Sequence, residues 1–287
     1  MVVDTKPNTI SDLIRISGLS HGTDVWLNNA QELIRSGKAT ISTAICTRDD
    51  IMTYLINKGM DSEESFTIME RVRKGTVAKG KCKEWPEFKK DMAEHNVPDW
   101  YVWSCEQIKY MFPKAHAAAY VMMAYRIAYC KINYPLAYYV AYFGIRADAF
   151  SYEIMCQGKE KLQYYIDDYN RRSATLSKKE QDTMKDMKIV QEMYARGFEF
   201  EPLDIYKAQA TKFLIVNGKL MPPLSSIDGM GEKAAEAVAE ASKDGTYLSL
   251  DDFRQRTKAS KTVIDTMVEL GILADLPASN QLSLFDF

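Results

Sequence analysis

The stretch IDGMGEKAAEAV, residues 227–238, decides how the last part of this chain folds. This stretch has the helix–hairpin–helix form: an apolar residue is followed by glycine–apolar–glycine and then by a helix rich in small residues. Gly229 and Gly231 allow backbone angles that other residues avoid, and they expose amide N–H groups where the next helix begins. The positive end of a helix dipole can hold a phosphate without reading base sequence. We therefore expect Ser226, Gly229, Gly231 and Lys233 to bind DNA, although a glycine-rich turn between two packed helices fits the motif equally well.

Helical periodicity extends outward from this module over most of the chain. A short β-hairpin is expected over 212–221, around the Asn217-Gly218 turn. Residues 224–276 are predicted to be one helical module, with a possible second, degenerate helix–hairpin unit in 250–275. The fold class is therefore mainly α: a multi-helix domain, then a helical region with a short β-hairpin and a helix–hairpin–helix module. Other helices are expected at 10–16, 24–36, 48–59, 62–73, 85–95, 98–111, 115–133, 135–143, 160–170 and 178–196.

A basic segment, residues 71–83, contains six lysines and arginines and no acid. Gly75 and Gly80 interrupt it, which predicts a flexible, positive loop after a helix. Such a loop can hold a polyphosphate or a nucleic-acid backbone, and Lys79 and Lys81 are the candidates for DNA contact. A solvated charged loop is the alternative. The segment lacks the G-x-x-x-x-G-K-[ST] spacing of a P-loop, so a nucleotide hydrolase of that class is not indicated.

The sequence KAHAAAY, residues 114–120, opens the longest predicted helix. Its small residues permit close approach of another backbone or a ligand, and Lys114 and His116 lie where helical N–H groups are unpaired. Seven tyrosines between residues 120 and 142 are numerous enough to stack on bases. Aromatic residues at helical spacing more often pack in a core, which is the interpretation favoured for these tyrosines.

Composition excludes several classes of protein and site. The net charge is −2 over 287 residues, so any basic surface must be local. The five cysteines form no C-x-x-C pair, which favours free thiols in a reducing, cytoplasmic compartment. Only three histidines occur, and neither a zinc motif nor any other metal site is indicated. No apolar run is long enough to span a membrane, so no membrane partner is expected.

The segment QLSLF, Gln281–Phe285, follows a short tether of small and polar residues. Leu282, Leu284 and Phe285 are apolar plugs, and Gln281 offers an amide donor and acceptor. Exposed apolar side chains in a short extended segment usually anchor a partner. The segment, Ser283 included, resembles the pentapeptide by which bacterial replication and repair proteins dock on the sliding clamp. The alternative is a tail packed on its own domain.

Five blocks of sequence in this order closely resemble the C-terminal part of the PolC-type DNA polymerase III alpha subunits of low-GC Gram-positive bacteria. The blocks are ISGLSHGTDVW from Ile16, IMERVRKG from Ile68, YMFPKAHAAAY from Tyr110, the hairpin module and the QLSLF segment. The resemblance implies a fingers domain over 1–147, a duplex-binding region over 148–276 and a clamp-binding tail over 277–287. It also implies that Arg73, Lys74, Lys114 and His116 face the triphosphate of the incoming deoxynucleotide.

The resemblance places the catalytic carboxylates and their Mg²⁺ ions in a palm domain that this chain lacks. No D-x-D pair, the usual cue for two-metal phosphoryl transfer, occurs in the sequence. We therefore expect no catalytic residue, metal or cofactor in this chain, and no polymerase activity from it alone. A stand-alone, clamp-docking DNA-binding adaptor is the alternative function, but an adaptor would not need the segment 114–120 or a nucleotide-facing basic loop.

Overall fold

The computed structural model describes residues 1–279, which form two compact units, Met1–Ile127 and Ala128 onward. Both units are built mainly from helices, and the β structure of the described part is a two-stranded antiparallel sheet. The predicted fold class is therefore confirmed. Among residues 1–279, no helix is both long and apolar enough to cross a bilayer. The predicted clamp-binding residues 281–285 lie outside the described part of the chain.

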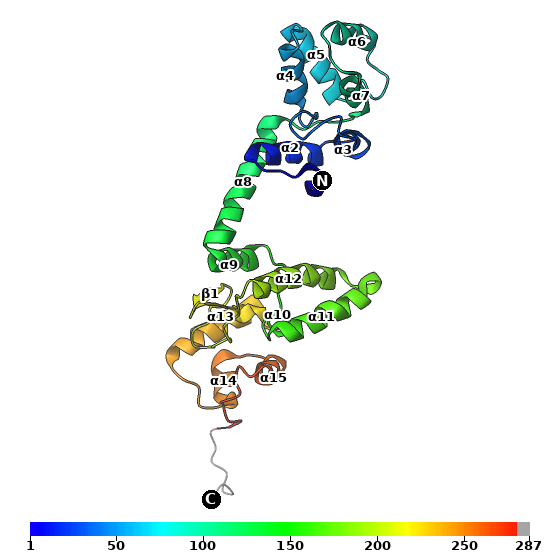
Figure 1. Cartoon of the computed structure of the whole chain (residues 1–287). Helices are drawn as coiled ribbons and strands as arrows, with labels where there is room; N and C mark the ends of the chain where they lie inside the picture. Colours follow the sequence, from blue (N-terminus) through cyan, green and yellow to red (C-terminus); the bar gives the residue numbers. More distant parts are fainter. Residues whose placement is uncertain (280–287) are drawn as a thin grey trace, which may run out of the picture. The chain divides into compact units, whose positions relative to one another are not determined.

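The helices of the first unit are drawn in Figure 1, and their buried side chains form one apolar core. Helices α4 and α5 lie side by side, and Ile51, Leu55, Ile68 and Val72 are buried between them and their neighbours. The start of α5 is fixed by Asp61, whose carboxylate accepts the N–H groups of residues 63 and 64. The elements are α1 (Val2–Thr5), α2 (Ile10–His21), η1 (Trp26–Ala30), α3 (Gln31–Arg35), α4 (Arg48–Asn57), α5 (Ser62–Arg73), α6 (Trp85–Glu94), α7 (Asp99–Gln107) and the first part of α8 (Lys114–Asn133).

The helix predicted over residues 24–36 is wrong as a continuous element. The backbone leaves helical geometry at Leu27, Asn28 and Asn29, and Asn28 has φ of 55°. The fully buried Asn29 side chain explains the break: its amide donates to the Ser104 carbonyl at 3.2 Å, and its oxygen accepts the Ser104 hydroxyl at 2.6 Å. These bonds to α7 outweigh helical periodicity, because unpaired buried polar groups are costly.

The second unit begins within α8 and contains two apolar cores. The first core forms where α9 packs with α12 and its neighbours, and it buries Tyr139, Phe143, Met187 and Val190. Helices α11 and α12 lie side by side (Figure 1). The elements preceding the sheet are α9 (Pro135–Ile145), α10 (Tyr152–Met155), α11 (Lys159–Arg171), η2 (Ser173–Thr175) and α12 (Lys178–Ala195). Helix α9 thus belongs to the second unit, upstream of the expected functional boundary at 147/148, which stays a prediction.

The predicted β-hairpin and the helical module complete the second unit. Strands β1 (Leu214–Val216) and β2 (Lys219–Met221) pair antiparallel, with Ile215 opposite Leu220. The second core buries Leu224, Val238 and Phe253. The possible second helix–hairpin unit contains the last two helices, and its assignment stays a prediction. The elements are η3 (Leu224–Ser226), α13 (Glu232–Ala241), η4 (Ser242–Asp244), α14 (Leu250–Thr257) and α15 (Lys261–Glu269).

Candidate functional site

Glu70, near the end of α5, is surrounded by three cationic side chains. Its carboxylate accepts two hydrogen bonds from Arg73, from Nε at 2.6 Å and from Nη2 at 2.8 Å. Lys74 Nζ lies 3.0 Å from Oε2, and Arg48 Nη1 of α4 lies 3.8 Å from Oε1. The hydrogen bonds from Arg73 are the main cause that lowers the pKa of Glu70 to about 2. The group therefore stays ionised and holds two of the predicted nucleotide-binding residues.

The predicted residue Lys114 joins this group through the start of α4. The Lys114 N–H donates to Asp49 Oδ2 at 2.7 Å, and the Arg48 N–H donates to the Phe112 carbonyl at 3.3 Å. Consecutive residues of α4 therefore tie the start of α8 to the end of α5. We call Arg48, Arg73, Lys74 and Lys114 the cation cluster.

His116, the fourth predicted nucleotide residue, lies beside the cluster. Its ring meets Phe112 edge-on, with centroids 5.2 Å apart, and meets Tyr120 at 5.5 Å. On the other side, Phe112 stacks on His21 at 5.4 Å. Tyr120 is largely exposed, as are Tyr125 and Tyr129 of α8 and Tyr134 just after it. The expected core role of the tyrosines is therefore wrong for these positions, whereas Tyr139 is buried.

The basic segment after α5 is folded into hydrogen-bonded turns, where a flexible loop was expected. Gly75 has φ of 68°, and an added Cβ would collide with the Lys109 carbonyl, so only glycine lets the chain pass this point. The N–H groups of residues 79, 80 and 81 donate to carbonyls within the segment. The Lys79 and Lys81 side chains are exposed, and no contact between described residues brings them to the cation cluster.

The glycine hairpin, residues 227–231, lies between η3 and α13. Gly229 has φ of 83° and therefore requires glycine, but Gly231 has an ordinary φ of −70°, so the expectation that both glycines need special angles is wrong for Gly231. An added Cβ at Gly231 would meet no atom within 4 Å. Neither backbone geometry nor packing in the described residues accounts for glycine at this position.

Gly231 precedes α13 and offers no side-chain cap, so the N–H groups of the first turn have no side-chain acceptor among the described residues. Lys233, in this first turn, is exposed. Ser226 is only 6% exposed, and its hydroxyl donates to the Pro223 carbonyl. Of the residues predicted to bind DNA here, Gly229, Gly231 and Lys233 are thus accessible, whereas Ser226 stabilises the approach to the hairpin.

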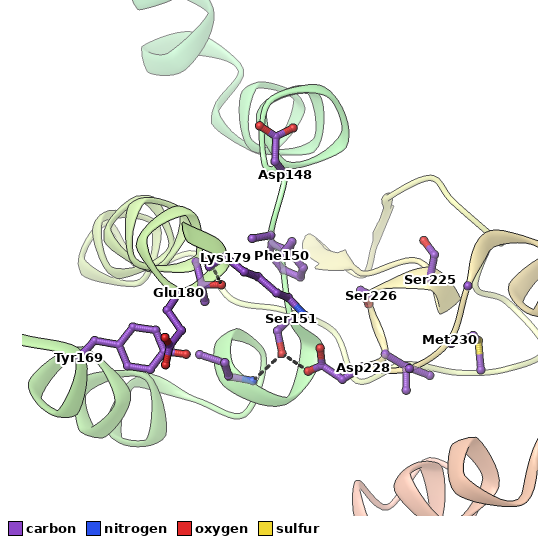
Figure 2. A pocket seen from close by; sticks show the side chains of 16 residues that line it. Asp148, Phe150, Ser151, Tyr169, Lys179, Glu180, Ser225, Ser226, Asp228 and Met230 are labelled. Atoms are coloured by element: carbon purple, nitrogen blue, oxygen red, sulfur yellow. Dashed lines mark hydrogen bonds between the residues drawn. The ribbon is translucent and has the colours of Figure 1, made fainter. Parts of the chain in front are cut away.

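A pocket of about 570 Å³ is lined in part by the glycine hairpin (Figure 2). The Ser151 hydroxyl donates to Asp228 and accepts the Ile154 N–H, which ties the hairpin to the start of α10 (Figure 2). Asp148, Glu180 and Asp228 give the lining negative charge, against Lys179. The carboxylates oppose binding of an anion in this pocket, and residues 232–234 in the first turn of α13 do not line it.

Sequence reasoning missed Arg48, Asp49 and Glu70. The spacing of Glu70 from Arg73 and Lys74, three and four residues on a predicted helix, was an available signal. Arg48 carries no comparable signal, because its approach to Glu70 depends on how α4 packs against α5. Among residues 1–279, no group of three or more His, Cys, Asp or Glu side chains fits a metal ion.

Two family models match separate parts of the chain. Residues 1–96 match the bacterial DNA polymerase III alpha subunit finger domain, and residues 197–282 match a helix-hairpin-helix motif. The first match contains Glu70 together with Arg48, Arg73 and Lys74 of the cation cluster. The second contains the glycine hairpin.

Curated relatives are similar over essentially the whole chain. DNA polymerase III PolC-type from Caldanaerobacter subterraneus subsp. tengcongensis is 51% identical over 285 residues, covering 99% of this chain and 20% of the relative. The protein of the same name from Clostridium perfringens is 50% identical, covering 99% and 19%, and that from Streptococcus thermophilus is 49% identical, covering 100% and 20%. The chain spans about a fifth of the length of these relatives. It is therefore homologous, over nearly all of its own length, to one region of DNA polymerase III PolC-type.

Proposed function

We propose that this chain is the C-terminal part of a PolC-type replicative DNA polymerase and contributes incoming-nucleotide contacts, non-specific duplex binding and sliding-clamp docking. The finger-domain and helix-hairpin-helix matches support the first two roles. The homology to DNA polymerase III PolC-type supports the proposal that these roles belong to a replicative polymerase. DNA synthesis itself is proposed for the whole polymerase.

The convergence of the cation cluster carries the nucleotide part of the proposal. Arg73 and Lys74 end α5, and Lys114 begins α8, yet Glu70, Arg48 and Asp49 connect them. A triphosphate carries several negative charges, which the three cationic side chains around Glu70 complement, and exposed Lys114 lies at the connected start of α8. His116 and Tyr120 add ring faces beside these charges. We expect the triphosphate of a deoxynucleotide to bind at the cation cluster.

The uncapped start of α13 supports the duplex-binding part. N–H groups without a side-chain cap and the positive helix end suit a DNA phosphate, and Gly231 leaves room for close approach of the backbone. Such contacts position a duplex without reading its sequence. Exposed Lys233, Lys79 and Lys81 would add charge, so binding should weaken as salt rises.

A pair of substitutions separates the two sites. Arg73→Ala should weaken binding of inorganic tripolyphosphate by about 10- to 100-fold, the value of one or two hydrogen bonds to a charged group. Gly231→Val should weaken duplex binding and leave tripolyphosphate binding unchanged, since its side chain would stand beside the exposed N–H groups. Calorimetry with tripolyphosphate and fluorescence anisotropy with a labelled duplex measure the two effects.

Arg35→Ala, which removes a pair with Asp4 elsewhere in the first unit, is the matched control and should change neither affinity. The nucleotide assignment is wrong if Arg73→Ala binds tripolyphosphate as tightly as the parent chain. The hairpin assignment is wrong if Gly231→Val keeps full duplex affinity while circular dichroism shows an intact fold.

Clamp docking is proposed from the QLSLF sequence, because its residues lie outside the described part. Leu282, Leu284 and Phe285 would fill an apolar pocket of a bacterial sliding clamp, with affinity on the order of micromolar for a single short peptide. Calorimetry should show clamp binding by the 287-residue chain and none by a chain ending at Asn280. Equal binding by both would contradict this role.

A further inference from the structure

Glu70 is the carboxylate that lies among the cations of the proposed polyphosphate site. Its side chain is 20% exposed and that of Arg73 is 22% exposed, so their ion pair is partly shielded from water. The negative charge of Glu70 should repel a polyphosphate and weaken its binding. The presence of this carboxylate in the site therefore needs another explanation.

The geometry of the Arg73 ion pair supplies that explanation. Glu70 engages Nε and Nη2 of the guanidinium, which is a bidentate arrangement that fixes the plane of the group. Within residues 1–279, Arg73 Nη1 donates no hydrogen bond, so its N–H groups stay available to a ligand. The same carboxylate contacts Lys74 at 3.0 Å through its second oxygen. Both cations are therefore held in place while retaining donors.

Fixing long side chains before a ligand arrives lowers the entropy lost on binding. Protein kinases use the same physical principle, since a glutamate holds the lysine that contacts nucleotide phosphates. We propose that Glu70 is a positioning residue, which orients Arg73 and Lys74 for the polyphosphate of a nucleotide. This inference rests on the nucleotide-binding role proposed for the cation cluster.

The sign of one substitution tests the idea. Glu70→Gln removes a negative charge, so charge repulsion alone predicts tighter binding of inorganic tripolyphosphate. Positioning predicts weaker binding, by about twofold to tenfold, the range expected when a long side chain must be ordered on binding. Calorimetry on the 287-residue chain at pH 7 gives the affinity, and circular dichroism checks that each variant is folded.

Two further variants separate positioning from effects on the helix. Glu63→Gln makes the same charge change in the first turn of α5, where the carboxylate forms no ion pair among the described residues, and it should not weaken binding. Glu70→Asp keeps the carboxylate and should recover part of the affinity lost in Glu70→Gln. If helix stability alone mattered, aspartate would be the worse substitution, because its helix propensity is lower than that of glutamine.

The outcomes also separate this inference from the proposed function. If the parent chain does not bind tripolyphosphate, or if Arg73→Ala binds it equally well, both ideas are wrong. If Arg73→Ala weakens binding while Glu70→Gln leaves it unchanged or tightens it, the cluster binds polyphosphate but Glu70 does not position it. Weakening by both, with partial recovery in Glu70→Asp, supports the positioning role.

Discussion

The cation cluster of the first compact unit and the glycine hairpin of the second are both proposed to contact phosphate, but they offer different donors. The cluster presents charged side chains: Glu70 pairs with Arg73 and Lys74, and Asp49 accepts the main-chain N–H of Lys114. The hairpin presents neutral main-chain N–H groups at the uncapped start of α13. A concentrated triphosphate charge suits the first arrangement, whereas the regularly spaced single charges of a DNA backbone suit the second.

The two sites also differ in the carboxyl groups near them, whose pKa values are shifted in opposite directions. In the first unit, Glu70 is surrounded by cations, and its pKa is lowered to about 2. In the second unit, Asp186 of α12 is 3% exposed and accepts the N–H of Ala149, a residue that lines the hairpin pocket. Burial, opposed by that hydrogen bond and reinforced by Asp148 and Asp182, raises the pKa of Asp186 to about 6. Positive charge thus gathers at one site and negative charge behind the other.

Lowering the pH should therefore change the contributions of these two carboxyl groups to folding stability in opposite directions. This is the largest expected effect. Glu70 has a lowered pKa, so its contribution to stability is present above its ordinary value of 4.5 and is lost as pH falls towards 2. Asp186 has a raised pKa, so the stability it contributes is full below 3.8 and is lost as pH rises through about 6. Each contribution is on the order of 3 kcal/mol at most.

Chemical denaturation of the parent chain, Glu70→Gln and Asp186→Asn between pH 3 and pH 8 measures these contributions. At pH 7 Glu70→Gln should be less stable than the parent, and the difference should shrink in acid. Asp186→Asn should be more stable at pH 8, since asparagine can still accept the Ala149 N–H, and the difference should vanish near pH 4. Parallel pH profiles for all three chains would contradict the contrast between the sites.

Sequence patterns predicted most of the framework around both sites. The helix predicted over 62–73 coincides with α5, because the capping of its start by Asp61 is a local interaction. The Asn217-Gly218 turn likewise predicted the β-hairpin. The break at Asn29 was missed because its cause, hydrogen bonds with Ser104, lies 75 residues away.

The two candidate sites were predictable to different degrees, because one is formed by neighbouring residues in the sequence and the other by distant ones. The glycine hairpin is contiguous in sequence, so its motif was recognisable, although the ordinary φ of Gly231 and the inward-facing Ser226 hydroxyl were not. The cation cluster depends on packing between α4, α5 and α8. A glutamate such as Glu70 in a helix resembles any solvated charge until tertiary structure brings Arg48 to it.

A smaller effect is expected from a substitution in the glycine hairpin, and it tests whether main-chain N–H groups bind phosphate there. Gly231→Ser should stabilise the fold by a few tenths of a kcal/mol, because a serine hydroxyl caps the first turn of α13 better than glycine does. The same hydroxyl would occupy an N–H group proposed for phosphate, so duplex affinity should fall about twofold to tenfold, the value of one hydrogen bond. Thermal unfolding and fluorescence anisotropy measure the two quantities. Tighter duplex binding together with higher stability would contradict main-chain recognition.

The smallest effect concerns the second helix–hairpin unit, which serves as the internal control. Ser260 precedes α15, and its hydroxyl accepts the Val263 N–H at 3.3 Å, so this helix start is already capped by its own chain. Ser260→Gly should therefore reproduce at α15 the uncapped start seen at α13, at a cost of a few tenths of a kcal/mol of stability. Duplex affinity should stay unchanged if only the first hairpin binds phosphate. Anisotropy with the same labelled duplex, measured beside Gly231→Ser, decides this point. A gain in duplex affinity on uncapping α15 would show that both hairpins face the DNA, whereas a loss would show that the Ser260 hydroxyl itself takes part in binding.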